Sequence, residues 1–334
     1  MNCLTNVPDE GGVKLANHLA RVFKAACPDT TIVSYGPTAQ GCDVHIPVQG
    51  KSMMNGTLAR FLMKHREDVV YFPAYTRMLD VALHTFSVSL FARCRVKTVL
   101  IMRGPMNTLA RWLFSLSRAE IITLCDETYD LFRHVVGQRA RKLKTGVDTS
   151  RFCPVSREEK MGLREKYGLP LDQTIVLHVG HMKASRNIGV MQHLATDLHG
   201  LLVTSTMTAA EADQALRTQL KQQENLTIID TYQPKVEELY QLADVYLFPV
   251  TKARNCIDVP LSVLEAAACG IPVVGTDYGE MKALLGCAGF YHLKNFSPKV
   301  MNELLRCAAQ EGVSPRESVL AYDWQLALAQ MERD

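Results

Sequence analysis

Two stretches in the C-terminal half combine residue types that can bind a phosphorylated ligand. In the first, residues 176–188 (VLHVGHMKASRNI), an apolar run ends at Gly180 and is followed by His181, Lys183 and Arg186. We expect the apolar run to form a strand, so three potential cations leave one strand end. Cations placed in this way can neutralise a diphosphate. The alternative is an ordinary solvated basic loop.

The second stretch, DVPLSVLEAAACGIPVVGTD at residues 258–277, predicts a helix followed by a buried strand. Pro260 suits the first helical turn and Gly270 the end of the helix. Free backbone amides at such a helix start favour a phosphate group, and the residues expected to bind it are Leu261, Ser262 and Val263. Glu265, one turn further on, could accept hydrogen bonds from sugar hydroxyls. The alternative makes Asp258 an N-terminal cap and Glu265 a solvated helix residue.

A glycine pair opens the N-terminal half. Gly11 and Gly12 follow the first apolar segment and precede a predicted helix. Glycines at this position let the backbone approach a ligand closely. The dinucleotide fingerprint Gly-x-Gly-x-x-Gly is absent here, which disfavours a nicotinamide-dependent oxidoreductase, and a plain turn is the alternative for the pair.

Short β-branched runs alternate with amphipathic stretches along the chain, which indicates an α/β fold with parallel sheets. The expected strands are Thr31–Tyr35, Val69–Phe72, Lys97–Met102 and Glu120–Leu124 in the first half, and Thr174–Gly180, Leu201–Ser205, Leu226–Asp230, Val245–Val250 and Ile271–Thr276 in the second. The expected helices of the first half are Val13–Ala26, Leu79–Ala92 and Glu127–Val136. The polar segment Thr145–Leu169 is the expected linker between two similar lobes, and the cleft between such lobes commonly binds a ligand.

Composition sets the class of protein. The chain has 334 residues, 47% of them hydrophobic, which is enough for two domains. Its longest apolar-biased runs are about fourteen residues, too short to span a bilayer. The first ten residues show no secretory leader, and the ten cysteines include no Cys-x-x-Cys pair. We therefore expect a reduced, cytoplasmic protein without structural zinc.

The net charge of +3 is unevenly distributed. Residues 1–150 hold 19 Lys and Arg against 12 Asp and Glu, whereas the remainder holds 18 against 22. A basic first half is compatible with an anionic partner, such as a phosphate-bearing substrate or a membrane surface. Its basic residues lack interleaved aromatics, so no nucleic-acid partner is expected.

Taken together, these features give a chain that resembles the retaining glycosyltransferases of family 4, which have the two-lobe GT-B fold. Five elements match that family in the right order: the glycine pair at 11–12, TGVDTSRFCP at 145–154, the loop from Gly180 to Arg186, LYQLADVYLFP at 239–249 and LEAAACGIPVV at 264–274. The resemblance implies two Rossmann-like, doubly wound parallel-sheet domains that face a central cleft. Residues 1–150 would bind the acceptor and residues 151–320 the donor, and a helix at 321–334, with Trp324 as a packing anchor, would pack back on the first domain.

The resemblance also implies an activity. A sugar would pass from a nucleoside-diphosphate donor, a UDP- or GDP-sugar, to an acceptor with retention at the anomeric carbon and without a cofactor. Glu265 matches the family's ribose-binding glutamate, Arg186 matches its phosphate-binding lysine, and His181 stands where arginine is usual. Gly12 matches the loop that approaches the donor. With Lys183, these groups would stabilise the leaving diphosphate in a water-poor cleft.

Two positions depart from the family's pattern. Ile257 stands where the first motif glutamate is expected, and we expect Asp258, one position later, to reach the sugar instead. Arg103, after the strand at Lys97–Met102, stands where many relatives have a histidine. Arginine stays protonated and cannot act as a base, so Arg103 would stabilise the departing diphosphate or bind an anionic acceptor. No Asp-x-Asp motif follows a strand in the expected donor site, so we predict that no metal is needed.

The acceptor side is less defined. The segment Gly50–Glu67 mixes Met53, Met54, Leu58, Phe61 and Leu62 with Lys51, Arg60, Lys64 and Arg66. This basic amphipathic pattern predicts peripheral binding to an anionic membrane, and the alternative is a core-facing helix. By resemblance, the acceptor would be a saccharide or a lipid-linked saccharide at the cytosolic membrane face, in surface polysaccharide or glycoconjugate biosynthesis. Three alternatives stay open: a decayed transferase that only binds nucleotide sugars, a phosphorylase and an epimerase.

Overall fold

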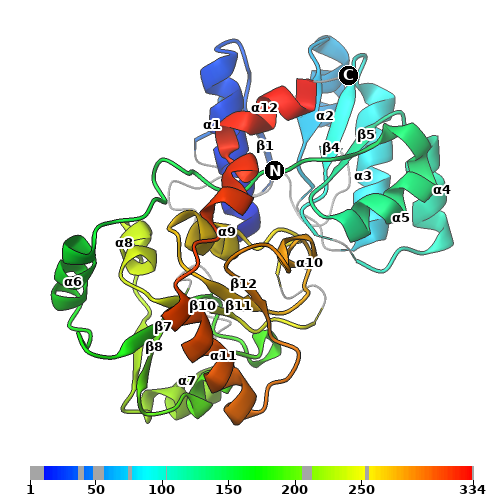
Figure 1. Cartoon of the computed structure of the whole chain (residues 1–334). Helices are drawn as coiled ribbons and strands as arrows, with labels where there is room; N and C mark the ends of the chain where they lie inside the picture. The colour runs from blue at the N-terminus through cyan, green and yellow to red at the C-terminus, as the bar shows by residue number, and fades with distance from the viewer. Residues whose placement is uncertain are drawn as a thin grey trace. The chain divides into compact units, whose positions relative to one another are not determined.

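The computed structural model of the chain describes residues 11–36, 41–47, 56–73, 77–102, 104–204, 213–252 and 256–332. The chain forms two compact units (Figure 1). The first unit consists of residues 1–144, 256–259 and 327–334, and the second consists of residues 145–255 and 260–326. The first boundary therefore follows Lys144, whereas the sequence pattern predicts it at residue 150.

Helices and short strands alternate through the first unit. Its elements are α1 (Gly11–Ala26), β1 (Val33–Gly36), β2 (Val44–Pro47), α2 (Gly56–Lys64), β3 (Val69–Tyr71), α3 (Met78–Phe91), β4 (Val96–Val99), α4 (Thr108–Leu116), β5 (Glu120–Thr123), α5 (Asp126–Val136) and β6 (Ala140–Lys142). Strands β3, β4, β5 and β6 form a parallel sheet in that order, and β1 pairs with β2 separately, also in parallel. Phe114 of α4 and Phe132 of α5 meet edge to face in its core, with ring centroids 4.9 Å apart.

The second unit has the longer and more regular sheet. Its elements are α6 (Arg157–Lys166), β7 (Thr174–Gly180), β8 (Leu198–Thr204), α7 (Gln214–Lys221), β9 (Leu226–Ile229), α8 (Val236–Gln241), β10 (Val245–Phe248), α9 (Leu261–Ala268), β11 (Val273–Gly275), α10 (Met281–Leu284), β12 (Phe290–His292) and α11 (Pro298–Glu311). A last helix, α12 (Trp324–Glu332), begins in the second unit and ends in the first.

Strand order gives the second sheet a switch point. The six strands run in the order β12-β11-β10-β7-β8-β9, and every pair is parallel. From β7 the chain adds β8 and β9 on one side, and then returns to add β10, β11 and β12 on the other. In open sheets of this kind, ligands bind outside the carboxyl ends of the two strands where the direction reverses. Here those strands are β7 and β10.

The predicted α/β class with parallel sheets is confirmed. The strand expected at Thr174–Gly180 has the predicted bounds, and every other expected strand overlaps an observed one. The expectation of a linker at Thr145–Leu169 is wrong in one respect, because this segment belongs to the second unit and contains α6. That helix starts at a capping box in which Ser156 and Glu159 satisfy each other's backbone amides, a local signal that the polar composition concealed.

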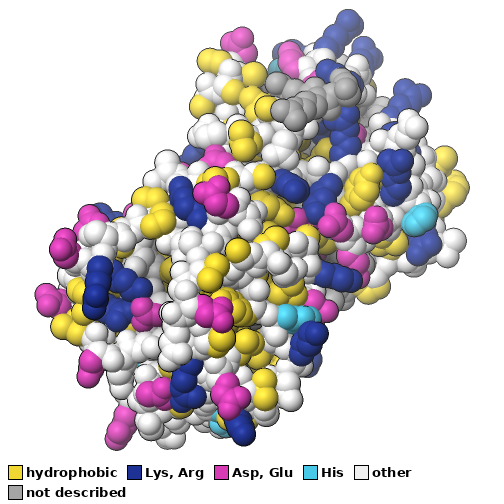
Figure 2. Space-filling model, viewed as in Figure 1, with side chains coloured by type: hydrophobic (Ala, Val, Ile, Leu, Met, Phe, Trp, Pro, Cys, Tyr) yellow, Lys and Arg dark blue, Asp and Glu magenta, His cyan; other side chains and the backbone are white. Residues whose placement is uncertain are grey.

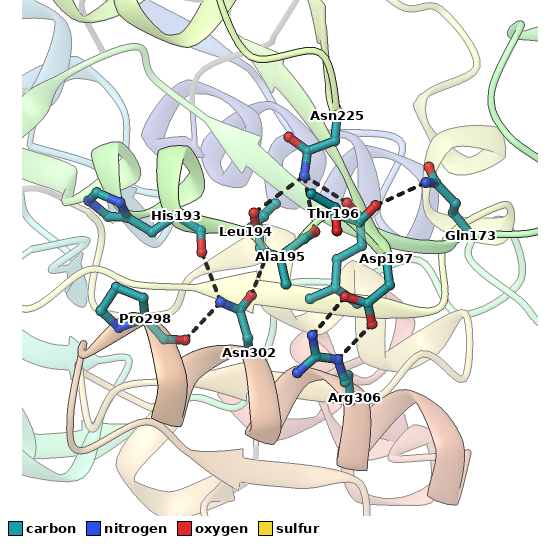
Figure 3. A network of polar contacts seen from close by, with 11 residues as sticks. Gln173, His193, Leu194, Ala195, Thr196, Asp197, Asn225, Pro298, Asn302 and Arg306 are labelled. Carbon is teal, nitrogen blue, oxygen red and sulfur yellow. Dashed lines mark hydrogen bonds and ion pairs between the residues drawn. The ribbon is translucent and has the colours of Figure 1, made fainter.

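A polar network fixes the connection between β7 and β8 (Figure 3). Asn302 of α11 donates to the carbonyls of His193 and Pro298 and accepts from the amide of Ala195. Asn225 donates to three carbonyls between residues 194 and 198. These hydrogen bonds hold the end of the β7–β8 connection against the rest of the unit. The loop that follows β7 is therefore fixed at both of its ends.

Within the described residues, no helix combines the length and apolar character needed to cross a membrane.

Candidate functional site

The predicted phosphate-binding loop leaves the carboxyl end of β7. His181, Lys183 and Arg186 are all partly exposed on it, and buried Met182 anchors it from within. The loop is compact: the amide of Lys183 donates to the His181 carbonyl at 2.9 Å, and the amide of Arg186 to the Lys183 carbonyl at 3.0 Å. A short 3-10 turn, Ala184–Arg186, follows. The structure therefore places all three predicted cations together at the switch point.

Gly180, the last residue of β7, lies where there is no room for a side chain. A Cβ at this position would lie 2.8 Å from Nε2 of His178 and 3.0 Å from Nη1 of Arg186. Real Cβ contacts as short as 2.8 Å are essentially never seen, so a side chain at Gly180 would require His178 to shift, and at 3.0 Å it would also crowd Arg186. Gly180 therefore permits the placement of Arg186.

The predicted anion-binding helix is α9, which follows β10 and lies next in the chain to the carboxyl end of that strand. It begins at Leu261, and Pro260 precedes it as the N-cap without a side-chain hydrogen bond. The first amides of an α-helix have no acceptor within the helix, so those of Leu261 and Ser262 face outward from its start. Leu261 and Val263 are buried, and Ser262 is half-buried. The alternative that Asp258 caps this helix is wrong, because Pro260 holds that position.

Glu265 is enclosed by protein. The residue is 3% exposed, and its Oε2 accepts a hydrogen bond of 2.7 Å from the hydroxyl of Tyr240 in α8. Burial, together with the charge of the neighbouring Glu265, raises the pKa of Tyr240 well above its usual value, so the hydroxyl keeps its proton and donates. The alternative of a solvated Glu265 is therefore wrong. Its predicted contact with a ribose stays a prediction.

The far end of α9 is held by a cation that the sequence pattern did not indicate. The guanidinium of Arg316 donates to the carbonyls of Ala268, Phe152 and Thr149. A cation that binds the last carbonyl of a helix also interacts favourably with its dipole. Arg316 therefore fixes the direction in which the start of α9 points.

Asp258 lies in the first unit, with residues 256–259. Its carboxylate is buried, and Oδ2 accepts from the hydroxyl of Thr128 at 2.5 Å and from the thiol of Cys125 at 3.6 Å. Burial and the adjacent carboxylate raise the pKa of Cys125 to about 12, so the thiol is protonated and can donate. These contacts give Asp258 a structural role in the first unit. The predicted contact of Asp258 with the sugar stays a prediction.

The remaining predicted residues are placed as follows. Gly12 lies buried in the first turn of α1, in the first unit. Ile257 lies close to Gly11 beside it, since a Cβ at Gly11 would lie 3.5 Å from Cδ1 of that side chain. Arg103 lies outside the described residues, so its predicted role stays a prediction. The structure thus brings the loop after β7 and the start of α9 to one sheet edge, while Gly12 and Asp258 belong to the other unit.

The structure also bears on metal binding and on the segment predicted to face a membrane. Across the described parts of the chain, no group of three or more His, Cys, Asp or Glu side chains could hold a metal ion.

In α2, Leu58 and Leu62 are buried in the core of the first unit, as the alternative of a core-facing helix predicts. Met53, Met54 and Lys51 lie outside the described residues.

The first unit has a pocket of its own, of about 430 Å³, lined by Tyr129, Arg133, Gln138, Ala140, Arg141, Lys142 and Gln330. Two of its cations already have carboxylate partners, since Arg141 pairs with Glu120 at 2.8 Å and Lys142 with Asp126 at 2.7 Å. These two ion pairs neutralise part of the positive charge that lines the pocket.

Part of the chain is similar in sequence to known glycosyltransferases. Residues 173–309 match the sequence family described as glycosyl transferases group 1. TuaC of Bacillus subtilis, whose name assigns it to teichuronic acid biosynthesis as a glycosyltransferase, is 24% identical over 170 residues, which cover 51% of this chain and 41% of TuaC. The chain spans less than half the length of the curated relatives it matches.

Two solved structures cover nearly the whole chain. A glycosyltransferase from Rickettsia africae superimposes with a TM-score of 0.77 at 13% identity, covering 96% of this chain and 93% of that one. HepE from Anabaena, in complex with UDP and glucose, gives a TM-score of 0.74 at 12% identity, covering 98% and 96%. At these identities the likeness shows the fold alone. The chain therefore has the GT-B fold of two Rossmann-like domains, and the group 1 glycosyltransferase match lies within its second unit.

Proposed function

We propose that the chain is a retaining glycosyltransferase of family 4, which transfers a sugar from a UDP- or GDP-sugar bound on the second unit. The observation that carries the proposal is that the loop with His181, Lys183 and Arg186 follows β7, and α9 comes after β10, the two strands that form the switch point. The group 1 match over the same unit supports it. HepE, which has this fold, was crystallised with UDP, and this supports a nucleoside diphosphate as the ligand.

The geometry suits the charge that develops during transfer. Breaking the bond between the sugar and the diphosphate builds positive charge on the sugar and negative charge on the leaving group. Lys183 and Arg186, with the amides of Leu261 and Ser262, would stabilise that negative charge. This arrangement needs no metal ion, and we propose that the reaction is metal-independent.

Glu265 would hold the nucleotide ribose. A carboxylate can accept about four hydrogen bonds in total, so the bond from Tyr240 is compatible with further bonds from ribose hydroxyls. Tyr240 fixes the position of the carboxylate, and Arg316 fixes the helix that carries it. Gly12, Asp258 and Arg103 are further residues that we propose to contact the sugar or the departing diphosphate.

The acceptor would be a saccharide or lipid-linked saccharide in surface polysaccharide biosynthesis, a role supported by the name of TuaC. A decayed nucleotide-sugar-binding protein is the second candidate, favoured by Ile257 and Arg103 at the two departures from the family's pattern. Turnover separates the two candidates, because the decayed protein would bind the nucleotide sugar without releasing nucleoside diphosphate.

The direct test measures thermal stabilisation by UDP, GDP and their sugar conjugates with EDTA throughout, because a ligand that binds only the folded state raises the melting temperature. We expect one nucleotide series to stabilise the wild type, and Arg186→Ala and Glu265→Gln to lose most of that shift. Lys221→Ala is the matched control, since this exposed lysine ends α7 near the amino end of β9, away from the proposed site. No shift with any nucleotide would refute the proposed function.

A membrane surface is the proposed partner of α4. Leu109, Trp112 and Leu116 are 50%, 55% and 48% exposed along one face of this helix, while Leu113 and Phe114 are buried on the other. Figure 2 shows hydrophobic side chains at the right-hand edge of the view, where α4 lies in Figure 1, with Lys and Arg side chains beside them. We define Leu109, Trp112 and Leu116 as the α4 stripe.

Charge favours an anionic membrane as the occupant of the α4 stripe. Residues 104–119 contain Arg111 and Arg118 and no Asp or Glu, and the first 150 residues are basic as a whole. A short helix with exposed Leu and Trp on one face and arginines nearby is typical of helices that lie in the membrane interface. The membrane-facing surface would thus be α4 rather than the segment Gly50–Glu67.

Vesicle flotation tests this partner. We expect the protein to float with mixed phosphatidylcholine–phosphatidylglycerol vesicles and far less with phosphatidylcholine alone, and we expect Leu109→Ser with Leu116→Ser to abolish flotation. Leu171→Ser, at a comparably exposed leucine of the second unit, should float like the wild type. Equal flotation of all variants would contradict the proposal, as would self-association that the α4 variants abolish.

A further inference from the structure

A buried histidine spans the switch point beneath the proposed donor site. His178 lies in β7, is 1% exposed, and places Nδ1 2.8 Å from the carbonyl oxygen of Leu247 in β10. A carbonyl can only accept, so Nδ1 carries the proton. Burial lowers the pKa of His178 to about 4, so the ring is neutral near pH 7. Its second nitrogen, Nε2, is therefore a bare acceptor.

The ring is held in place on two sides. It stacks on Tyr246 of β10, with ring centroids 6.2 Å apart and an angle of 18° between the planes. The hydroxyl of Tyr246 in turn lies 3.2 Å from the carbonyl oxygen of Val179 and 3.4 Å from its amide. The tautomer and the direction of Nε2 are thus fixed by contacts between the two strands of the switch point.

Nε2 of His178 has no hydrogen-bond partner among the described residues. It faces the same small space as the guanidinium of Arg186, because Nε2 and Nη1 both lie within 3.0 Å of one point above Gly180. The positive charge of Arg186 also contributes to the lowered pKa of His178, as expected for neighbours. A buried acceptor without a partner is costly, so a donor supplied at this point is stabilising.

We propose that His178 is a positioning residue for Arg186: its Nε2 accepts a hydrogen bond from the guanidinium when a nucleoside diphosphate binds, and so directs the other guanidinium donors at the diphosphate. This inference rests on the proposed function. Arginine has five N–H donors in a rigid fork, so one can bond backward to His178 while others bond forward to phosphate oxygens. Phosphate itself cannot bond to Nε2, since both are acceptors.

A double-mutant cycle tests the inference. The dissociation constants of UDP and GDP are measured by calorimetry, with EDTA, for wild type, His178→Phe, Arg186→Ala and the double variant. Phenylalanine keeps the ring and removes both nitrogens. We expect each single variant to weaken binding by roughly tenfold or more, and the double variant to bind no more weakly than Arg186→Ala alone, because both act through one group. If His178 only stabilises the core, the losses of affinity in the two single variants would multiply in the double variant. That result overturns the inference.

A second pair of variants keeps the test decisive if His178→Phe does not fold. In His178→Gln the side-chain amide reaches the position of Nε2 and can supply an acceptor, whereas the shorter side chain in His178→Asn reaches only the position of Nδ1. We expect Gln to retain most of the affinity and Asn to lose it, and the reverse order overturns the inference. If the wild type binds neither UDP nor GDP, both the proposed function and this inference fail. If the losses of affinity in the two single variants multiply in the double variant, only this inference fails.

Discussion

The hydroxyl of Tyr240 offers a quantitative test of how Glu265 is held. Tyr240→Phe removes one oxygen from a fully buried ring and leaves Oε2 of Glu265 without its 2.7 Å donor, inside protein and next to no bulk water. A hydrogen bond to a charged group contributes roughly 1.5–3 kcal/mol, so we expect the free energy of unfolding of the second unit to fall by about 2 kcal/mol. For a unit of this size, that corresponds to a melting temperature lower by about 4–8 °C.

The assay for Tyr240→Phe is urea unfolding followed by the fluorescence of Trp324, which is buried in the second unit, in a Trp112→Phe background. Tyr291→Phe is the matched control. Its hydroxyl also donates to a carboxylate, that of Glu311, but at the surface, where water replaces the lost donor. We expect the control to change stability by less than about 0.5 kcal/mol. Equal, small effects of both substitutions would refute the reasoning that Tyr240 compensates a buried charge.

Three further outcomes are expected. The pKa of His178 is about 4 in the folded state and about 6.5 when the ring is exposed. The free energy of unfolding of the second unit should therefore be highest above about pH 6.5 and fall as the pH approaches 4. Unfolding followed by Trp324 fluorescence should show that this free energy depends less on pH in His178→Phe. Gly180→Ala should weaken UDP or GDP binding by roughly tenfold in the same calorimetric assay, since the new Cβ would displace the guanidinium of Arg186. Gly162→Ala, where a Cβ meets nothing within 4 Å, should bind like the wild type. Thr128→Val should destabilise the first unit by about 1–3 kcal/mol in urea unfolding followed by circular dichroism, because Asp258 loses a buried donor; an unchanged midpoint would show that Cys125 suffices.

The second sheet was largely predictable because its strands β8, β10 and β11 are fully buried and most of β7 is buried, so these strands are apolar over several residues. The strand at Thr174–Gly180 and the cationic loop after it are signalled within thirteen consecutive residues. The surroundings of Glu265 were not predictable in the same way. Its partner Tyr240 lies 25 positions earlier, and helix periodicity alone cannot distinguish a buried carboxylate from a solvated one.

Asp258 shows the same limit over a longer range. Its partners Thr128 and Cys125 lie 130 and 133 positions away, so no local pattern could indicate that residues 256–259 pack within the first unit. No helix was expected from the sequence at α4, so its exposed face was not predicted either. An apolar stripe at helical spacing normally predicts burial, and only the structure shows that Leu109, Trp112 and Leu116 point to solvent while a second apolar face packs inside.

The division of the chain has a consequence for its synthesis. Most of the first unit precedes the second along the chain, yet the first unit also includes residues 256–259 and 327–334. The hydrogen bond from the buried hydroxyl of Thr128 forms only after Asp258 has been synthesised. The ammonium of Lys97 donates to the carbonyl of Met331 at 2.5 Å, so this bond forms only after Met331 has been synthesised. During translation, the domain that leaves the ribosome first is therefore completed last. Until then, surfaces that are buried in the finished unit stay exposed, and such transient exposure favours aggregation.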